Sequence, residues 1–287
     1  MPTALVTDST AYLPEDLVEG AGVRVVPLHV VVGGREHREG VDIDVARVAE
    51  ALRSFVPVST SRPAPAAFLA AYEAAARAGA DAVVSVHLSA ELSSTVGGAE
   101  AAAASAPVPV TVVDSRALGM VMGHAVLAGA RAARGGAGAD EVADVVRRTC
   151  VGAGVVFYVD TLEYLRRGGR IGRAGALLGS ALAIKPILGL RDGQIVPVER
   201  VRTSTRAIAR LEDLSVDAAT QAARDGATGV DLAVHHLDSA ERAAGLRERL
   251  SARLPGADVR VVELGAVVGA HVGPGTIAVA VVPRVAG

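Results

Sequence analysis

A short basic segment is the part of this 287-residue sequence whose residue types most directly suggest chemistry. Residues 166–173 read Arg-Arg-Gly-Gly-Arg-Ile-Gly-Arg, so four guanidinium groups and three glycines occupy eight positions. The wider window 166–210 holds ten basic and two acidic side chains, whereas the whole chain has a net charge of −2. Such a local excess indicates an anionic ligand head, a phosphate or an acidic patch on another protein, and the overall balance argues against nucleic-acid binding.

The same segment also has a purely structural interpretation. Gly168 and Gly169 can end a short helix in the left-handed conformation, and Arg166 and Arg167 in its last turn would complement the helix dipole. The residues alone leave both interpretations open.

Hydroxyl side chains follow strand-like runs at two further places. Ser93 and Ser94 stand at the start of an expected helix, where a hydroxyl and free backbone amides can hold a carboxylate or phosphate. The same serines can equally serve as helix caps alone. Thr60 and Ser61 stand in a segment that Pro63 keeps extended, so their hydroxyls could point into a cleft.

His271 is the histidine with the most suggestive surroundings. It follows an apolar run and precedes Gly273-Pro274-Gly275, a turn that brings backbone close to whatever the imidazole faces. A satisfied core histidine would look the same. No cluster of His and Cys has metal-ligand spacing, and the single cysteine, Cys150, lies in apolar surroundings that favour a buried inert thiol and a reducing, cytoplasmic compartment.

Two aspartates occupy equivalent places after apolar strands. Asp8-Ser9 and Asp114-Ser115 both follow β-branched runs, and the carboxyl ends of parallel strands line the crevice where open α/β sheets bind ligands. With Asp160, these carboxylates could hold a metal and form a phosphatase or hydrolase site. The alternative is that both aspartates only cap the helices that follow them.

The elements that must position these residues alternate between strands and helices in the first half of the chain. This rhythm predicts a doubly wound parallel sheet with helices on both faces. Near residue 150 the sequence pattern changes, and hairpin signals appear beside helical segments. This pattern predicts an α+β domain with a mixed or antiparallel sheet. We therefore expect an N-terminal α/β domain over 1–152 and a C-terminal α+β domain over 153–287. The individual elements expected are strands at 4–7, 23–26, 82–86, 110–113, 155–159, 184–188, 194–201, 230–235, 258–264 and 276–282, and helices at 44–55, 65–78, 92–105, 117–134 and 203–224.

Composition limits the class of protein. Aromatic residues make up 2% of the chain and Trp is absent, so the core must consist of Ala, Val, Leu and Ile. The uncharged stretch 264–283 is interrupted by Gly-Pro-Gly, which favours two buried pieces joined by a turn over a transmembrane segment. The start Met1-Pro-Thr lacks a basic region, so we expect no signal peptide.

Ten short motifs, taken in order, resemble the DegV family over nearly the whole chain. One such fragment would be weak, but ten in sequence are highly specific. They are Asp8-Ser9-Thr10 with Leu13-Pro14, Val26-Pro27-Leu28, Thr60–Pro63, Ser89–Thr95, Val113-Asp114-Ser115, Thr161–Gly172, Lys185-Pro186, Asp192-Gly193, Val201-Arg202-Thr203 and His271–Gly275.

The resemblance implies a two-domain, DegV-like fold with a long-chain fatty acid buried between the domains. Members with an assigned role are fatty-acid-binding subunits of bacterial fatty acid kinases, which present the carboxylate to a separate ATP-dependent kinase subunit and then hold the acyl phosphate. It thus implies a lipid-binding carrier without catalysis of its own and without a cofactor other than its lipid ligand.

The motifs also suggest roles for particular residues. By resemblance, Ser93 with Ser94 and the Thr60/Ser61 pair would bind the carboxylate, and His271 and Arg170 would lie by the head group. Arg173 and Arg202 would belong to a basic face toward the kinase or the phosphate. This sequence departs from the family pattern at three places, which are Ser94 where glycine is usual, Arg62 where glutamine is commoner, and His235-His236-Leu237.

The energetics suit such a ligand. Each buried methylene contributes about 0.8 kcal/mol, so a sixteen-carbon tail could supply on the order of 10 kcal/mol. That exceeds the several kcal/mol lost when a carboxylate is desolvated. The competing hypothesis remains the metal-dependent hydrolase built on Asp8 and Asp114.

Overall fold

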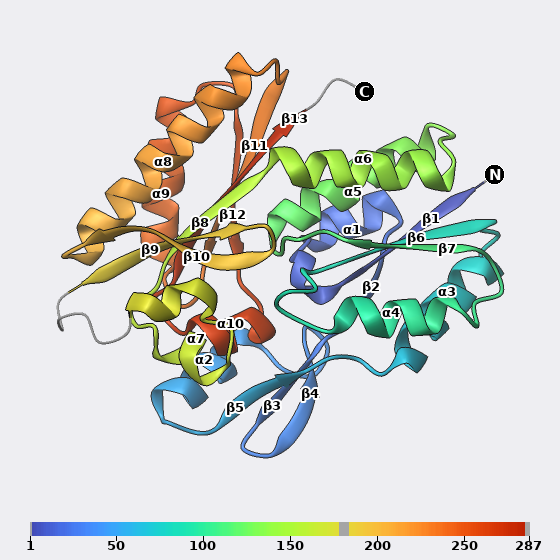
Figure 1. Ribbon diagram of the computed structural model, residues 1–287, viewed down its shortest axis with the longest axis horizontal. Coiled ribbons are helices and arrows are strands. Elements are labelled where there is room, and N and C mark those ends of the chain that lie inside the picture. The colour runs from blue at the N-terminus through green and yellow to red at the C-terminus, as the bar shows by residue number, and fades with distance from the viewer. Residues whose placement is uncertain (1, 178–183, 285–287) are drawn as a thin grey trace.

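The first half of the chain builds a parallel sheet with the strand order β2-β1-β6-β7 (Figure 1). The structure is a computed structural model that describes residues 2–177 and 184–284. The strands of this sheet are β1 (Thr3–Asp8), β2 (Arg24–Val26), β6 (Ala82–His87) and β7 (Val110–Asp114). All pairings in this sheet are parallel, as the alternation of strands and helices predicted.

Helices cover both faces of the sheet, because successive strand residues point to opposite sides. Leu5 and Val84 pack with Met122 and Val146 on one face, whereas Val6 packs with the helices of the other face. The predicted doubly wound arrangement is therefore confirmed. The covering helices are α1 (Glu15–Ala21), α5 (Met120–Arg134) and α6 (Ala139–Gly152) on the first face, and α3 (Pro65–Arg77) and α4 (Thr95–Ala103) on the second.

A second, three-stranded antiparallel sheet in this domain was not predicted. It has the order β4-β3-β5 and lies beside α2 (Val45–Arg53). Its strands are short, and β4 and β5 are largely polar although β3 contains three valines, so hydrophobic periodicity gave little signal for the sheet. The Gly33-Gly34 pair, with φ of 57° and 83°, makes the β3–β4 turn and was the available hairpin signal. The strands are β3 (His29–Val32), β4 (Arg35–Arg38) and β5 (Val58–Ser61).

The second half forms a six-stranded mixed sheet with the order β10-β9-β8-β13-β11-β12. Only β11 and β12 pair in parallel, and the other neighbours are antiparallel, which confirms the predicted α+β character. Two long helices, α8 (Ser204–Arg224) and α9 (Ala240–Arg253), bury one face of this sheet. The strands are β8 (Gly154–Tyr158), β9 (Lys185–Arg191), β10 (Gln194–Val201), β11 (Gly229–His236), β12 (Asp258–Glu263) and β13 (Ile277–Arg284).

Element boundaries were predicted less well than element types. The helix expected from residue 92 begins at Thr95, because residues 92–94 form a turn, and neither α1 nor α6 was predicted. The stretch 264–283 does form two pieces joined by a turn, α10 (Ala266–Val272) and β13. No helix in the described ranges combines the length and apolar character needed to cross a membrane.

The two domains share apolar surface. Helix α10 belongs to the second half of the chain, yet Ala266 and Ala270 pack with Val30 and Val48 of the first half. On the other side of the junction, the start of α5 packs against β11 and β13. Helix α6 ends at Gly152 and β8 begins at Gly154, so the division expected at 152/153 falls between the two large sheets and stays a prediction.

Close packing of α5 gives a testable expectation about two glycines. A Cβ at Gly123 would lie 2.7 Å from the Ala11 carbonyl oxygen, whereas a Cβ at Gly97 in α4 would meet nothing within 4 Å. Gly123→Ala should therefore destabilise the protein by about 1–3 kcal/mol through overpacking. Gly97→Ala should stabilise it by about 0.5–1 kcal/mol, because alanine costs less conformational entropy in a helix. Urea unfolding of both variants measures this, and equal effects would contradict the packing described here.

Candidate functional site

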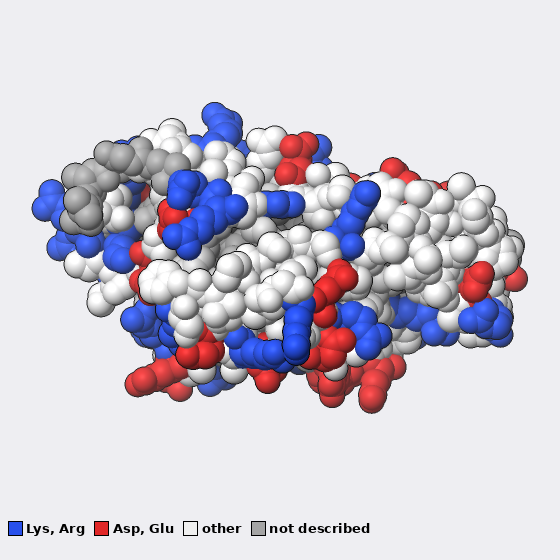
Figure 2. Space-filling view, turned by 90° about the horizontal axis from the view of Figure 1, so that it is seen from below, with Lys and Arg blue, Asp and Glu red and all other residues white. Residues whose placement is uncertain are grey.

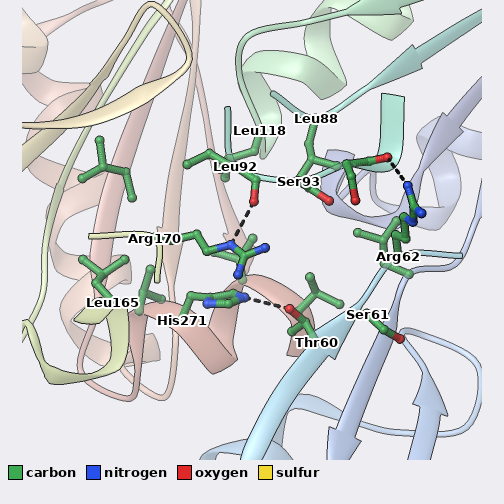
Figure 3. A pocket seen from close by; sticks show the side chains of 16 residues that line it. Thr60, Ser61, Arg62, Leu88, Leu92, Ser93, Leu118, Leu165, Arg170 and His271 are labelled. Atoms are coloured by element: carbon green, nitrogen blue, oxygen red, sulfur yellow. Dashed lines mark hydrogen bonds between the residues drawn. The ribbon is translucent and has the colours of Figure 1, made fainter. Parts of the chain in front are cut away.

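A cavity of about 290 Å³ lies where the two domains meet (Figure 3). One domain contributes the ends of β5 and β6 and the turn before α4, and the other contributes α7 (Glu163–Arg167), β10 and α10. All six residues predicted to bind a ligand line this cavity. The full lining is Leu28, Thr60, Ser61, Arg62, Leu88, Leu92, Ser93, Ser94, Leu118, Leu165, Arg170, Ile195, Val267, Val268, His271 and Val272.

Thr60 and His271 join the two domains at this cavity. The hydroxyl of Thr60 on β5 lies 2.8 Å from Nε2 of His271 on α10, although the residues are 211 positions apart. Figure 3 shows the imidazole between the Thr60 hydroxyl and the Arg170 guanidinium. The contact fixes the ring in the wall of the cavity.

Burial keeps the His271 imidazole neutral. Desolvation, with a smaller contribution from the Arg170 charge, lowers the pKa of His271 to about 4. Its Nδ1 is buried and has no hydrogen-bond partner among the described residues. A Cβ at Gly168 would collide with this nitrogen, so glycine at 168 is what allows the ring its position. A neutral imidazole has one donor and one acceptor nitrogen, and here Nε2 faces the Thr60 hydroxyl while Nδ1 packs beside Gly168.

The end of α7 directs Arg170 toward the cavity. Gly169 has a φ of 70°, its amide bonds the Arg166 carbonyl at 3.1 Å, and the Arg170 amide bonds the Leu165 carbonyl at 2.9 Å. These two bonds are a Schellman motif, which turns the chain sharply. The left-handed helix end was predicted, but Gly169 alone adopts it, since Gly168 has a φ of −73°.

Arg170 then bridges the domains through backbone carbonyls. Its Nε donates to the Leu92 carbonyl at 2.9 Å, and a terminal nitrogen donates to the Gly168 carbonyl at 2.7 Å. Among the described residues it has no carboxylate partner. Its charge is therefore available to an anion at the cavity.

The side of the cavity opposite His271 is formed by Ser93, Ser94 and Arg62. The Ser93 hydroxyl lies 2.8 Å from the Thr95 hydroxyl, and Arg62 donates to the Ser94 carbonyl at 3.3 Å. Ser94 has a φ of −80°, which any residue adopts, so its backbone here does not require the glycine usual at this position. Arg62 was noted in the sequence only as a departure, and the structure adds it to the lining.

Ser61 differs from its neighbour Thr60. Adjacent strand residues point to opposite faces, and the Ser61 hydroxyl donates to Glu36 at 2.9 Å. Figure 3 shows it directed away from the imidazole. Ser61 lines the cavity, but its hydroxyl is already engaged elsewhere.

Apolar side chains supply the rest of the wall. Leu88, Leu92, Leu118 and Leu165 surround the polar group, and no Asp or Glu is among the described lining residues. Sequence reasoning did not identify these positions, because isolated leucines in helices and strands look like any core residue. The only available signal was their closeness in sequence to the motifs at 89–95 and 161–172.

The other basic residues divide into paired and unpaired groups. Arg166 and Arg167 both bind Glu163, Arg210 binds Glu199, and Lys185 lies 3.8 Å from Asp160. The other six of the ten basic residues in the window 166–210 form no ion pair within residues 2–177 and 184–284. Figure 2 shows basic side chains gathered at the left end, over the second domain. Arg173 and Arg202 are both exposed, and neither lines the cavity.

The aspartates proposed for a metal are engaged in structural hydrogen bonds. Asp8 accepts from the amides of Thr10 and Leu88 and from Nδ1 of His87, each at 3.0 Å. Asp114, separated from Asp8 by β6, accepts from the amides of Arg116 and Ala90. In the described part of the chain no group of three His, Cys, Asp or Glu is arranged to hold a metal ion. Asp8 caps the short 3-10 helix Ser9–Ala11, as the capping interpretation predicted. Asp114 instead bonds the amides of a turn, because the next helix, α5, begins only at Met120.

Asp8 also belongs to a buried network that sequence reasoning missed. Nε2 of His87 lies 2.7 Å from the Ser85 hydroxyl, which accepts from Tyr72 at 3.0 Å. Serine, histidine and aspartate occur in the order of a catalytic triad. Ser85 and His87 are 0% exposed, however, so a substrate could not reach the hydroxyl. The network holds β1 and β6 together.

Cys150 lies in the apolar surroundings expected for it. It packs at the margin of the first-domain core, and burial raises the pKa of its thiol to about 12. A thiol with that pKa is a poor nucleophile near neutral pH.

The low pKa of His271 predicts a pH effect on stability. An unfolded histidine titrates near pH 6.5, so below that pH the unfolded chain binds a proton that folded His271 refuses, and stability falls as the pH falls. Between pH 6.5 and 5 this should cost about 1.6 kcal/mol relative to His271→Asn, which cannot titrate. Urea unfolding of both proteins at each pH measures the difference. Parallel pH profiles would contradict the depressed pKa.

Comparison with known proteins identifies the family. A family model described as "Uncharacterised protein, DegV family" matches residues 2–284. A DegV domain-containing protein of Streptomyces coelicolor is 51% identical over 282 residues, 98% of this chain and 98% of that protein. The solved structure of a fatty-acid-binding DegV family protein from Thermus thermophilus has a TM-score of 0.90 at 36% identity and covers 99% of this chain and 100% of its own. DegV of Bacillus subtilis, a fatty acid binding protein, has a TM-score of 0.90 at 32% identity with coverage of 99% and 100%. The chain belongs to the DegV family.

Proposed function

We propose that the protein binds a long-chain fatty acid in the cavity between its domains. The observation that carries this proposal is the composition of the lining, in which hydroxyls, an imidazole and two guanidinium groups adjoin a wall of leucines and valines. A ligand that matches this lining has an anionic head and a long apolar tail. Fatty acids combine both features.

The head group would lie against Thr60, Ser93, Arg170 and His271. The carboxylate needs donors and positive charge to offset desolvation, and Arg170 supplies charge that no described carboxylate neutralises. Hydroxyls and the neutral imidazole of His271 add hydrogen bonds without a competing negative charge. Arg62 would contribute a second guanidinium from the opposite side.

The tail would lie along the apolar part of the wall. At about 290 Å³ the cavity is near the lower end of the range typical of small-molecule sites, roughly 300–1,000 Å³. Each methylene buried there contributes about 0.8 kcal/mol, so the tail would determine affinity and the head group would determine register.

Two relatives support this ligand. The structurally similar proteins from Thermus thermophilus and Bacillus subtilis are both described as fatty acid binding, and each is more than 30% identical to this chain over 99% of its length.

We further propose that the protein is a substrate-presenting subunit. It would act in the cytoplasm as a carrier without catalysis or a cofactor of its own, and offer the bound carboxylate to a separate ATP-dependent kinase subunit that forms the acyl phosphate. Phosphoryl transfer depends on positioning and charge neutralisation, which suits a site that holds its ligand by hydrogen bonds and guanidinium groups. The exposed Arg173 and Arg202 would face the kinase or the phosphate.

Lipid binding is tested on the purified protein and on two cavity variants. Mass spectrometry of the extracted lipid should detect a long-chain fatty acid at close to one per chain. After delipidation, Ser93→Ala and His271→Ala should each weaken fatty-acid affinity about tenfold, because each removes a hydrogen bond to a charged head group worth roughly 1.5 kcal/mol. Calorimetric titration measures the affinities.

Ser251→Ala on the exposed face of α9 is the matched control and should bind as the wild type does. Absence of fatty acid from the extract, together with no binding after delipidation, would refute the proposed function. Unchanged affinity in both cavity variants would refute the head-group assignment alone.

The kinase-facing role is tested by Arg202→Ala. Arg202 lies two residues before α8 and outside the cavity, so its loss should slow acyl-phosphate formation by the kinase severalfold and leave fatty-acid affinity unchanged. Arg224→Ala, at the opposite end of the same helix and about 30 Å away, should change neither quantity. Weaker lipid binding with normal kinase turnover would contradict this role.

A further inference from the structure

Glu39 is a buried carboxyl group that the proposed binding site does not use. It follows β4 in the first domain and is 6% exposed. Oε1 accepts a hydrogen bond from the Val267 amide at 2.7 Å, and Oε2 accepts from the Ser9 hydroxyl. Val267 belongs to the first turn of α10, which is part of the second domain. The carboxyl therefore bonds a helix end across the domain junction.

Helix α10 needs a cap from elsewhere because its own N-cap residue is glycine. Gly265 has no side chain to accept from the first-turn amides, which lack partners inside a helix. Glu39 takes that place, and the Tyr12 hydroxyl accepts from the next amide, Val268, at 3.2 Å. Tyr12 in turn lies 3.4 Å from Glu39 Oε1. Two first-domain side chains thus bond consecutive amides of α10.

Gly265 is also what makes room for this carboxyl group. A Cβ at position 265 would collide with Glu39 Oε1 and with the Tyr12 ring. Gly265 has a φ of −74°, so its backbone conformation does not require glycine. Glycine is required at this position because the Glu39 and Tyr12 side chains of the first domain approach it closely.

The capped helix forms part of the cavity wall. Val267 and Val268, whose amides receive these bonds, line the cavity, and His271 lies one turn after Val267 on the same face. Because the helix is short, a shift of its first turn would also move the His271 imidazole, whose Nε2 lies 2.8 Å from the Thr60 hydroxyl.

We propose that Glu39 is a positioning residue for the ligand head group, which acts by capping α10 from the other domain and so fixing His271 at the cavity. This inference rests on the proposed function, because it assigns Glu39 a role in binding at the same site.

The two carboxyl oxygens have separate partners, which suggests a conservative variant. Burial raises the pKa of Glu39 to about 7, with Asp8 adding to the shift and the Ser9 and Val267 bonds opposing it. Oε1 can accept from Val267 in either protonation state. Glutamine keeps that acceptor, so Glu39→Gln should preserve the cap and Glu39→Ala should remove it.

Fatty-acid titration of the delipidated full-length protein tests the proposal. Glu39→Ala should weaken affinity about tenfold and Glu39→Gln less than about threefold, with the number of sites unchanged in both. On a His271→Ala background, Glu39→Ala should add less than about threefold, since residues that act through one another are not additive. Glu263→Ala, an exposed glutamate two positions before Gly265, is the matched control and should bind normally.

A second measurement needs no ligand. The NMR signals of the His271 imidazole should shift in Glu39→Ala and stay in place in Glu39→Gln, which separates this inference from the proposed function. Wild-type affinity in Glu39→Ala, a full tenfold effect on the His271→Ala background, or unmoved His271 signals in Glu39→Ala would each overturn it. A wild-type protein that binds no fatty acid would instead overturn the proposed function and leave the NMR comparison standing.

Discussion

The hydrogen bond between Thr60 and His271 is the contact on which the candidate site depends. It joins a strand of the small antiparallel sheet to a helix of the other domain, at the point where both contribute to one cavity. Three neighbouring features keep the strand and the helix in place. Helix α10 packs through apolar side chains against β3 and α2, and Gly168 leaves space for the imidazole. The hydrogen bond from Arg170 to the Leu92 carbonyl joins the two domains at the same junction.

Much of the large-scale fold follows from sequence periodicity. Apolar runs separated by amphipathic segments predicted the parallel sheet, its helices on both faces and the mixed sheet of the second half. The small sheet that carries Thr60 could not be found this way, because β4 reads Arg-Glu-His-Arg and β5 reads Val-Ser-Thr-Ser. Such strands are stabilised by tertiary packing, and propensity alone gives them little support.

The candidate site likewise was predictable from the sequence in part only. The motifs placed Thr60, Ser93, Arg170 and His271 in one cavity, since a resemblance over the whole chain carries three-dimensional information that spacing lacks. The directions in which the side chains point did not follow from the resemblance. That Ser61 bonds Glu36 depends on strand alternation, and that Glu39 reaches Val267 depends on contacts between segments 228 residues apart. The sequence allowed a metal at the aspartates only as the competing hypothesis, and the backbone amides that they bond became evident from the structure.

Because both domains contribute to the wall of the cavity, it is completed late in synthesis. A nascent chain that has reached residue 152 already contains Thr60 and Ser93 and can fold its parallel sheet, since domains generally fold as units from the N-terminus. The imidazole it needs is more than a hundred residues from being made. Incomplete translation products therefore lack one side of the cavity, and only a finished polypeptide presents its complete wall to a ligand.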